Sequence, residues 1–448
     1  MRNILNSFLG LNELPIELQK LIIRVFILFS LFQLFLGLGN SFIILAYIEK
    51  FGFGIAGFLM AIIFSCQFVT DYPTGSLGDY IGQKWVIVLS LVFFGLGYSI
   101  VSSFNSYIMF ILASMMFGVG LGQLSGAFES YLDNNYQRLA VNVDEDRKLY
   151  GFMYQRVTTI GSVLMGISFL IGGLLSNFYS RDFVFLLTGL LSLTLIPFMI
   201  IFLNDYRKKE VEKSTSKPNY FYYLKGGFSF LFSSKKIFFL LVGLAILTSC
   251  TMIWGFLILF PFYNLYTGTD AGVGFLRSAI FLTGSVIGIY SARLNKKLNN
   301  KYLGRLYLVF LSSLFIGVII LINILPGNDS FNLIGIILVY LLMITTVSFM
   351  GSLAMTLAQR ALIMNVPSDK RNAIYSLIPT IGLIIQVPFL IVVGNSIEIG
   401  GLTIGIVIIL ILSFIGSMFL FVYHYYDNKV SISQEQDIFR EGVPSETL

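Results

Sequence analysis

Twelve apolar stretches, each about 20 residues or longer, account for most of this sequence. A helix of about 20 apolar residues spans the hydrocarbon core of a bilayer, which is about 30 Å thick. The stretches form continuous runs, such as residues 240–247, whereas the strands of a membrane barrel alternate polar and apolar residues. We therefore predict an all-α polytopic membrane protein, with transmembrane helices at 23–48, 54–78, 85–104, 107–132, 151–176, 182–203, 237–264, 273–292, 306–325, 331–358, 373–394 and 400–425.

The low charge content supports this fold class. Asp, Glu, Lys and Arg make up 12% of the residues, whereas soluble proteins have about 25%. This composition excludes a soluble domain, a disordered chain and a disulfide scaffold. Cys66 and Cys250 lie in apolar stretches, so we expect reduced thiols buried among helices. The sequence has one histidine, His424, and we expect no His-ligated metal site, no cofactor and no His-based catalytic triad.

The distribution of Lys and Arg predicts the orientation in the membrane. If the N-terminus is cytoplasmic, all but three of the 29 basic residues fall in cytoplasmic segments, and the exceptions are Lys50, Arg181 and Arg277. Cytoplasmic loops of membrane proteins carry an excess of Lys and Arg. We therefore predict a multi-pass protein of the cell membrane with both termini in the cytoplasm. The net charge of +6 then reflects this topology rather than nucleic-acid binding.

A polar stretch at 204–236 divides the predicted helices into two sets of six. It predicts an N-terminal six-helix bundle at 1–203, a cytoplasmic linker at 204–236, a C-terminal six-helix bundle at 237–426 and a cytoplasmic tail at 427–448. The predicted outer loops are only a few residues long. A polytopic enzyme that acts on lipid-linked substrates is the alternative from another class, and it would need large loops with clustered His, Asp or Glu.

Glycines and prolines predict how the helices pack. Gly118, Gly122 and Gly126 follow one another at four-residue spacing on one face of the fourth helix, which predicts close packing against a neighbouring helix. Prolines interrupt four helices, and we expect ordinary kinks at Pro197, Pro261, Pro379 and Pro388.

The segment after the second helix, residues 71–84, reads DYPTGSLGDYIGQK. Its glycine at 75 and its aspartate at 79 are one helical turn apart, so the glycine opens a close-packing face beside the carboxylate. The segment resembles the loop signature of the major facilitator superfamily, G-x-x-x-D-[RK]-x-G-[RK]-[RK]. It matches this signature at Gly75, Asp79, Gly82 and Lys84, while Tyr80 and Gln83 replace two of its basic residues.

The resemblance implies a transporter with two six-helix bundles related by pseudo-twofold symmetry. Substrate would bind at the midplane between the bundles, which would rock to expose it to either side in turn. The resemblance also implies a gate on the cytoplasmic side, where the second helix would pack near the eleventh. That eleventh helix begins just after Arg371, and the partial positive charge of its N-terminus would attract the Asp79 carboxylate.

Two further motifs resemble a prokaryotic, drug-exporter-like branch of the superfamily. The second helix of that branch reads E-x-P-T-G, and Asp71 takes the place of the Glu here; the fourth reads S-G-x-x-E, which residues 125–129 match. Two features depart from proton-coupled exporters. Ser114 lies near the place of an arginine in their fourth helix, and residues 168–169 replace a Gly-Pro pair in their fifth. The branch favours export without naming a cargo.

Ionisable residues inside the hydrocarbon are costly and are functional candidates for that reason. The sequence places four there: Asp71, Glu129, Arg156 and Arg277. Burial favours a neutral carboxyl group and a nearby arginine favours an ionised one, so a movement of Arg156 would change proton affinity. We expect Glu129 to carry the proton, Asp71 to act as a second acid that modulates the proton affinity of Glu129, and Arg156 to supply the movable counter-charge. A purely structural ion network is the alternative.

Polar and aromatic residues near the middle of helices define the predicted substrate cavity. They are Gln33, Asn40, Gln123, Trp254, Arg277 and Gln386. As a set they describe a mostly apolar cavity, which favours amphipathic or lipophilic small molecules over sugars and phosphorylated anions. We therefore expect a secondary active transporter that exports such a compound, with protons as the coupling ion. A proton-coupled importer of a small nutrient is the alternative within transport.

Overall fold

The computed structural model is almost wholly helical over the residues that it describes, which are 6, 9–12, 14–125, 127–140, 144, 148–203, 231–232, 234–295, 298–327, 331–365 and 371–440. Within these helices, side chains are not described at 72–80, 137–138, 148, 152, 288–289, 291–293, 295, 300, 363–365, 371–379 and 428–440. Ten stretches of the described chain are long and apolar enough to cross a membrane. Two of them, Ile16–Asp71 and Thr380–Asp427, contain a non-helical glycine at which the chain reverses, so the described chain makes twelve crossings, as predicted.

The described helices of the N-terminal half are α2 (Ile16–Asn40), α3 (Ile43–Ile81), α4 (Gln83–Ser103), α5 (Tyr107–Leu124), α6 (Ala127–Ala140), α7 (Lys148–Phe178) and α8 (Arg181–Phe202). The first crossing consists of α2 and the start of α3. Gly52 reverses the chain, and the rest of α3 forms the second crossing. The φ angle of Gly52 is 79°, a left-handed value that glycine adopts at little steric cost.

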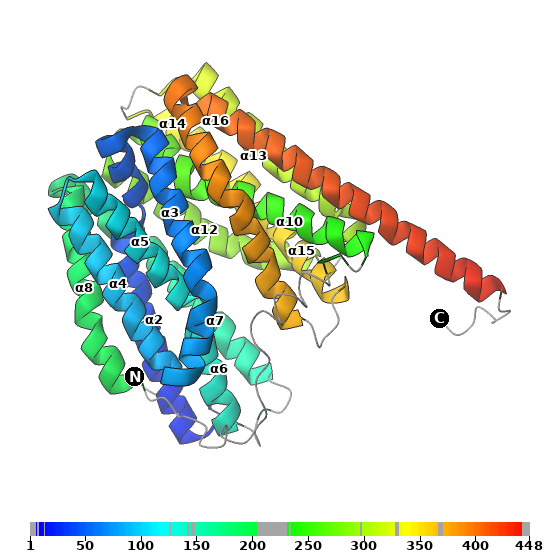
Figure 1. Ribbon diagram of the computed structural model, residues 1–448, viewed down its shortest axis with the longest axis horizontal. Coiled ribbons are helices and arrows are strands. Elements are labelled where there is room, and N and C mark those ends of the chain that lie inside the picture. The colour runs from blue at the N-terminus through cyan, green and yellow to red at the C-terminus, as the bar shows by residue number, and fades with distance from the viewer. Residues whose placement is uncertain are drawn as a thin grey trace.

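The described helices of the C-terminal half are α10 (Lys235–Ile253), η2 (Trp254–Ile258), α11 (Leu259–Thr267), α12 (Asp270–Asn295), η3 (Asn300–Tyr302), α13 (Leu303–Ile324), α14 (Leu333–Met343), η4 (Ile344–Gly351), α15 (Ser352–Asn365) and α16 (Arg371–Arg440). Gly401, with a φ angle of 79°, divides α16 into the eleventh and twelfth crossings. Figure 1 shows these two parts of α16, in orange and red, meeting at the top of the view.

Two crossings of the C-terminal half contain a π-helical turn, η2 in the seventh and η4 in the tenth. Pro261 accounts for η2. Proline has no N–H and its ring clashes with the carbonyl group four residues earlier, so regular α-helical bonding is lost just before it. In η4, the hydroxyl groups of Thr345 and Thr346 donate back to carbonyl oxygens of the preceding turn, a type of bonding that bends helices.

The structure corrects three predicted helix limits. The first helix begins at Ile16 and not at 23. The fourth, predicted as continuous over 107–132, breaks between α5 and α6, where Ser125 has a ψ angle of 111°. The twelfth continues to Arg440, into the stretch predicted as a tail. Glycine is a poor helix former, which explains a break where glycine follows Ser125 in the sequence. Many polar residues are good helix formers, so the twelfth helix continues beyond its apolar stretch.

The predicted glycine face of the fourth helix is confirmed at two positions. A Cβ atom built on Gly118 would lie 2.6 Å from the Cβ of Cys66, and one built on Gly122 would lie 3.0 Å from the backbone nitrogen of Asp71. Both contacts are with α3, so the glycines allow α5 to pack closely against it. Gly126 lies outside the described residues.

The crossings run between two ends of the molecule, shown at the top and bottom of Figure 1. The short-turn end, as we call it, consists of the turns around 49–53, 104–106, 179–182, 265–272 and 398–401, together with the described residues 325–327 and 331–332. The opposite end, which we call the linker end, contains the start of α2, the end of α8 and the start of α10. Most of the predicted linker lies outside the described residues.

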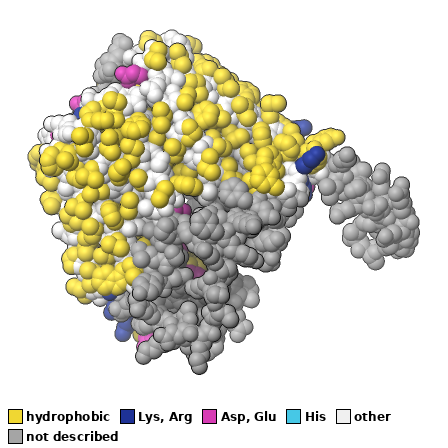
Figure 2. Space-filling view, in the orientation of Figure 1, with side chains coloured by type: hydrophobic (Ala, Val, Ile, Leu, Met, Phe, Trp, Pro, Cys, Tyr) yellow, Lys and Arg dark blue, Asp and Glu magenta, His cyan; other side chains and the backbone are white. Residues whose placement is uncertain are grey.

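The outer surface of the helices is apolar. Large hydrophobic side chains are exposed on both halves, among them Phe198 on α8 and Ile411 on α16. Figure 2 shows hydrophobic side chains over most of the described surface in view, with charged side chains near its edges. Such a surface is suited to contact with lipid chains rather than with water.

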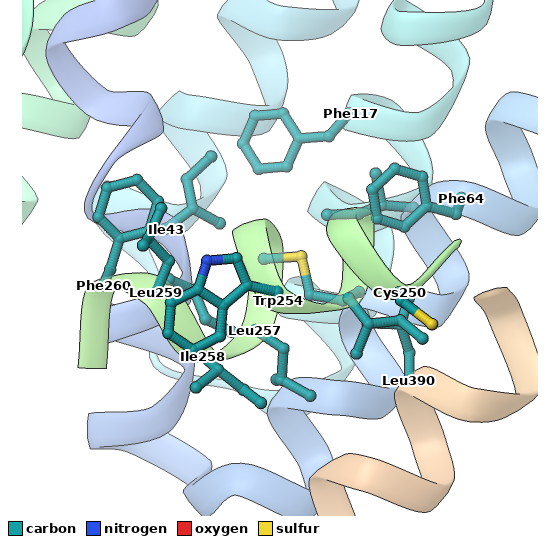
Figure 3. Close-up of a cluster of buried hydrophobic side chains, with 14 of the residues drawn as sticks. Ile43, Phe64, Phe117, Cys250, Trp254, Leu257, Ile258, Leu259, Phe260 and Leu390 are labelled. Atoms are coloured by element: carbon teal, nitrogen blue, oxygen red, sulfur yellow. The ribbon is translucent and has the colours of Figure 1, made fainter. Parts of the chain in front are cut away.

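The interior where the halves meet is also apolar. Figure 3 shows buried hydrophobic side chains from both halves in one cluster, including Phe64 on α3, Trp254 in η2 and Leu390 on α16. The ring of Phe64 lies 4.9 Å from that of Phe256 in an edge-to-face arrangement. The two halves thus share a hydrophobic core as well as the polar contacts described next.

Candidate functional site

The first place where the halves approach closely is the α3–α16 seam, a contact between two glycines. A Cβ atom built on Gly57 would lie 2.5 Å from the carbonyl oxygen of Leu390 and 3.1 Å from the Cα of Gly394. One built on Gly394 would lie 2.7 Å from the carbonyl oxygen of Phe53. Because these neighbours are backbone atoms, neither glycine can gain a side chain unless the two helices separate.

A carboxylate lies at the short-turn end of this seam. Glu398 of α16 accepts hydrogen bonds from the backbone N–H groups of Phe53 at 2.5 Å and Gly54 at 3.3 Å. These are the first amides after the reversal at Gly52, and the free amides at the start of a helix attract negative charge. Glu398 therefore joins the C-terminal half to the N-terminal half through the backbone of α3.

The second close approach is the α7–α12 seam, also between two glycines. A Cβ atom built on Gly274 would clash with the carbonyl oxygen of Phe169 and lie 3.0 Å from the Cα of Gly173. At the short-turn end of this seam, Asp270 accepts two bonds from the guanidinium group of Arg181, at 2.8 Å and 2.7 Å. Planar paired contacts of this kind are among the stronger polar interactions in proteins.

Arg181 and Asp270 belong to a wider polar network. The Ser176 hydroxyl group also donates to Asp270, and Arg181 reaches Glu49 at 2.5 Å. Asp270 belongs to the C-terminal half, whereas the other three residues belong to the N-terminal half. The network must therefore break if the halves separate at the short-turn end.

A cavity of about 730 Å³ opens at the short-turn end between the two seams. Both halves line it, with Phe53 and Arg181 on one side and Asp270 and Leu402 on the other. Its charged side chains are paired with one another, Arg181 with Asp270 and Glu49, and Lys50 with Asp182. The cavity is thus a vestibule above a closed contact between the halves.

The predicted coupling residues lie near the linker end and bridge three helices. Asp71 on α3 accepts a hydrogen bond from the side chain of Ser125, and Glu129 on α6 accepts one from the Tyr154 hydroxyl group at 3.2 Å. Both carboxylates are exposed in the structure, and Arg156 on α7 is half-buried. The break in the fourth crossing therefore brings the two exporter-like motifs together, through Ser125 and Asp71.

The predicted gating motif is described in part. Gly82 has a φ angle of 102°, a left-handed value that allows a tight turn at this position of the signature. Lys84 donates to the carbonyl oxygen of Ile200 at 2.6 Å, where its positive charge complements the C-terminal end of α8. The helix α16 begins at Arg371. The side chains of Asp79 and Arg371, and the surroundings of Gly75, lie outside the described part of the structure.

Three of the predicted cavity residues have a buried polar atom without a hydrogen-bond partner in the structure: Gln123, Arg277 and Gln386. Buried polar atoms are rarely left unpaired in native proteins, so such atoms need water or a ligand. Trp254 has another environment, because its ring packs against those of Phe262 and Phe315.

The remaining two predicted cavity residues lie on α2. Gln33 is half-buried and lies close to Gly161 of α7. Asn40 is exposed at the last position of α2. The structure therefore distributes the predicted cavity set between interior and surface positions.

Sequence reasoning missed four residues that join elements: Tyr154, Arg181, Asp270 and Glu398. In the sequence Arg181 stands out only as an exception to the charge bias, although it is one of the few charged residues in the outer turns. Charges opposite one another across short outer loops were the available signal. Tyr154 had no such signal, since it is one of 24 tyrosines.

Comparison with known proteins agrees with this architecture. The chain belongs to the Major Facilitator Superfamily, whose sequence profile matches residues 26–388. It is therefore a secondary transporter and a multi-pass membrane protein rather than an enzyme. Among curated proteins, none matches it in sequence.

Many solved structures share the fold, and two of them are structures of a nucleoside transporter. One is the nucleoside transporter NupG, with 15% sequence identity and a TM-score of 0.69 over 90% of this chain and 98% of that one. The other is a single-residue variant of NupG, with 13% identity and a TM-score of 0.68 over the same shares. At these identities the likeness concerns the fold alone.

Proposed function

We propose that the protein exports a small amphipathic or lipophilic organic molecule across the cell membrane. The observation that supports this most directly is the apolar interior shared by the two halves, around Phe64 and Phe256. The few buried polar atoms without partners, such as those of Gln123 and Gln386, would orient a cargo that is held mainly by apolar contact.

In this proposal the short-turn end faces the outside and both termini face the cytoplasm, with the bundles divided at 204–236. The two seams then form the outer gate in its closed state. The cargo would enter from the linker end and leave when Glu398 and Asp270 release the N-terminal half. A gate of Gly75, Asp79 and Arg371 at the linker end would close in that second state.

We further propose that export is coupled to protons through Glu129, with Asp71 as the modulating acid and Arg156 as the counter-charge. The hydrogen bonds of Asp71 and Glu129 join α3, the Ser125 break, α6 and α7. A rearrangement of these helices would change what each carboxylate contacts, and with it the proton affinity.

Purified protein in liposomes with an imposed pH gradient tests this function. A panel of small organic molecules should include compounds whose accumulation depends on the gradient. Glu129→Gln mimics the protonated form, so it should abolish gradient-driven accumulation and retain exchange of substrate, while Asp71→Asn should weaken coupling less. Gradient-driven accumulation by Glu129→Gln with an unchanged proton requirement would contradict the assignment of Glu129.

The second candidate is proton-coupled import of a small nutrient. The shared fold with a nucleoside transporter supports nucleosides as the first nutrients to test. Uptake by inside-out and right-side-out vesicles separates the two candidates, because an exporter accumulates cargo only in inside-out vesicles.

A further inference from the structure

Arg277 lies in the interior of the C-terminal half without an acidic partner. It follows Asp270 by two turns on the same face of α12, about 10 Å further from the short-turn end. The acids between 237 and 426 are Asp270, Asp329, Asp369 and Glu398, and of the two that the structure describes, Asp270 begins α12 and Glu398 lies next to the reversal at Gly401. Among the described residues, no carboxylate lies within ion-pair distance of Arg277. An unpaired arginine at this depth is costly and marks a functional position.

Three aromatic rings surround its guanidinium carbon. Their centroids lie 5.5 Å away for Phe169, 5.4 Å for Phe260 and 5.1 Å for Phe281. Aromatic faces attract cations at such distances and offset part of the cost of burial. Phe169 belongs to α7 of the N-terminal half, so the cage is built by both halves of the protein.

Two polar groups lie beside this cage. The Nε atom of Arg277 is buried without an acceptor, and the hydroxyl group of Tyr263 is buried next to the guanidinium group and interacts with it. A buried donor that stays unpaired destabilises a protein, and the aromatic rings provide no oxygen acceptor. The Tyr263 oxygen can accept one bond from the guanidinium group, but its own proton and the Nε–H of Arg277 both still need an acceptor. The positive charge of Arg277 favours an anionic one.

We propose that Arg277 and Tyr263 bind the carboxylate group of the transported compound, whose apolar body lies against the phenylalanine rings. This inference rests on the proposed transport function and narrows the cargo to amphipathic organic acids. A carboxylate suits the site because its two oxygens match the planar fork of a guanidinium group. A single described cation balances one negative charge, which favours a carboxylate over a phosphate dianion.

The composition of the cage links binding to the movement of the halves. Separation at the α7–α12 seam would remove Phe169 from Arg277 and expose the guanidinium group on one side. The carboxylate of the cargo would then contact an Arg277 that is packed against Phe169 in the closed state and is not in the open state. A difference in contacts between states is what allows a cargo to shift their populations.

Matched pairs of probes test the proposal. Phenylacetate and indoleacetate are compared with their neutral amides, first by the melting temperature of the purified protein and then by transport into liposomes. The acids should raise the melting temperature and half-saturate transport at concentrations about tenfold lower than the amides. Arg277→Gln should remove this preference for the acids over the amides, and Tyr263→Phe should reduce it in part.

Arg305→Gln is the matched control, because Arg305 lies over the ring of Tyr302 but is exposed on α13 near the linker end. It should keep the preference for acids. Arg277→Lys retains the positive charge and should keep a weaker preference, which keeps the test valid if Arg277→Gln is poorly folded.

Two results would overturn the proposal: no preference for either acid in the wild-type protein, or an unchanged preference in Arg277→Gln. Transport of neutral compounds by Arg277→Gln would leave the proposed function intact in both cases. Absence of gradient-dependent transport of every compound by the wild-type protein would instead overturn the proposed function, whatever the melting temperatures show.

Discussion

The α3–α16 and α7–α12 seams have similar geometry and different chemistry. In each, a glycine of one half meets a glycine of the other, and a carboxylate of the C-terminal half lies at the short-turn end. Glu398 is bound by backbone N–H groups, whereas Asp270 is bound by the side chain of Arg181. A substitution in the N-terminal half can therefore remove the donor of one seam and not of the other. The α7–α12 seam is therefore the one whose closing contact can be removed by substituting a side chain.

The glycines should have the largest effect, because they are what the seams share. Gly57→Ala and Gly274→Ala each place a Cβ atom against backbone of the facing helix. Overpacking of this kind costs about 1–3 kcal/mol, and we expect values near the upper limit, since backbone atoms cannot rotate away. Spin labels at Phe178→Cys and Ile399→Cys, both on exposed positions, report the separation of the halves.

In this measurement both variants should shift the distances at the short-turn end from closed to open, and transport should fall. Gly151→Ala is the control, because a Cβ atom there meets nothing within 4 Å. Closed distances in Gly57→Ala that match those of the wild-type protein would show that the glycine contact does not govern closure.

Arg181→Ala should have the next largest effect and act on the α7–α12 seam alone. It removes two hydrogen bonds from Asp270, whose side chain is only 10% exposed. Loss of hydrogen bonds to a charged group costs about 1.5–3 kcal/mol, so the open state should gain population. The same spin-label pair measures it, and the exchanged pair Arg181→Asp with Asp270→Arg should restore closure. If neither Arg181→Asp nor Asp270→Arg alone opens the short-turn end, the polar network does not control the gate.

Glu398→Gln should have a smaller effect on the α3–α16 seam. The amide oxygen can still accept from the N–H of Phe53, but without the negative charge that the start of a helix favours. The expected cost is about 1 kcal/mol, the difference between charged and neutral acceptors. An effect on the spin-label distances larger than that of Arg181→Ala would reverse the order of the two seams.

Lys50→Ala should have the smallest effect. Lys50 lies 3.5 Å from Asp182, whose side chain is 51% exposed, and both belong to the N-terminal half. Exposed ion pairs contribute at most about 1 kcal/mol, and this one does not cross between the halves. Transport rates and spin-label distances should match those of the wild-type protein. A clear opening would mean that the vestibule charges act together rather than through Asp270.

Much of the fold follows from the sequence because membrane insertion depends on local hydropathy. Twelve crossings and the turn at Gly82 are predictable from nearby residues alone. The seams are not, since nothing in a chain with 42 glycines indicates that Gly57 meets Gly394. The cage around Arg277 is hidden in the same way among 44 phenylalanines. Such contacts depend on packing between distant segments, which a local pattern does not record.

The π-helical turn η2 has a consequence for insertions and deletions. A π-helical turn holds about one residue more than an α-helical turn, so removing one residue from η2 would let α-helical bonding resume and leave the orientation of the segment beyond almost unchanged. Phe260 and Tyr263 would then still face Arg277. The same deletion from a regular α-helix would rotate the segment beyond by about 100°. This crossing can therefore lose one codon at η2 and keep the same side chains directed at the interior.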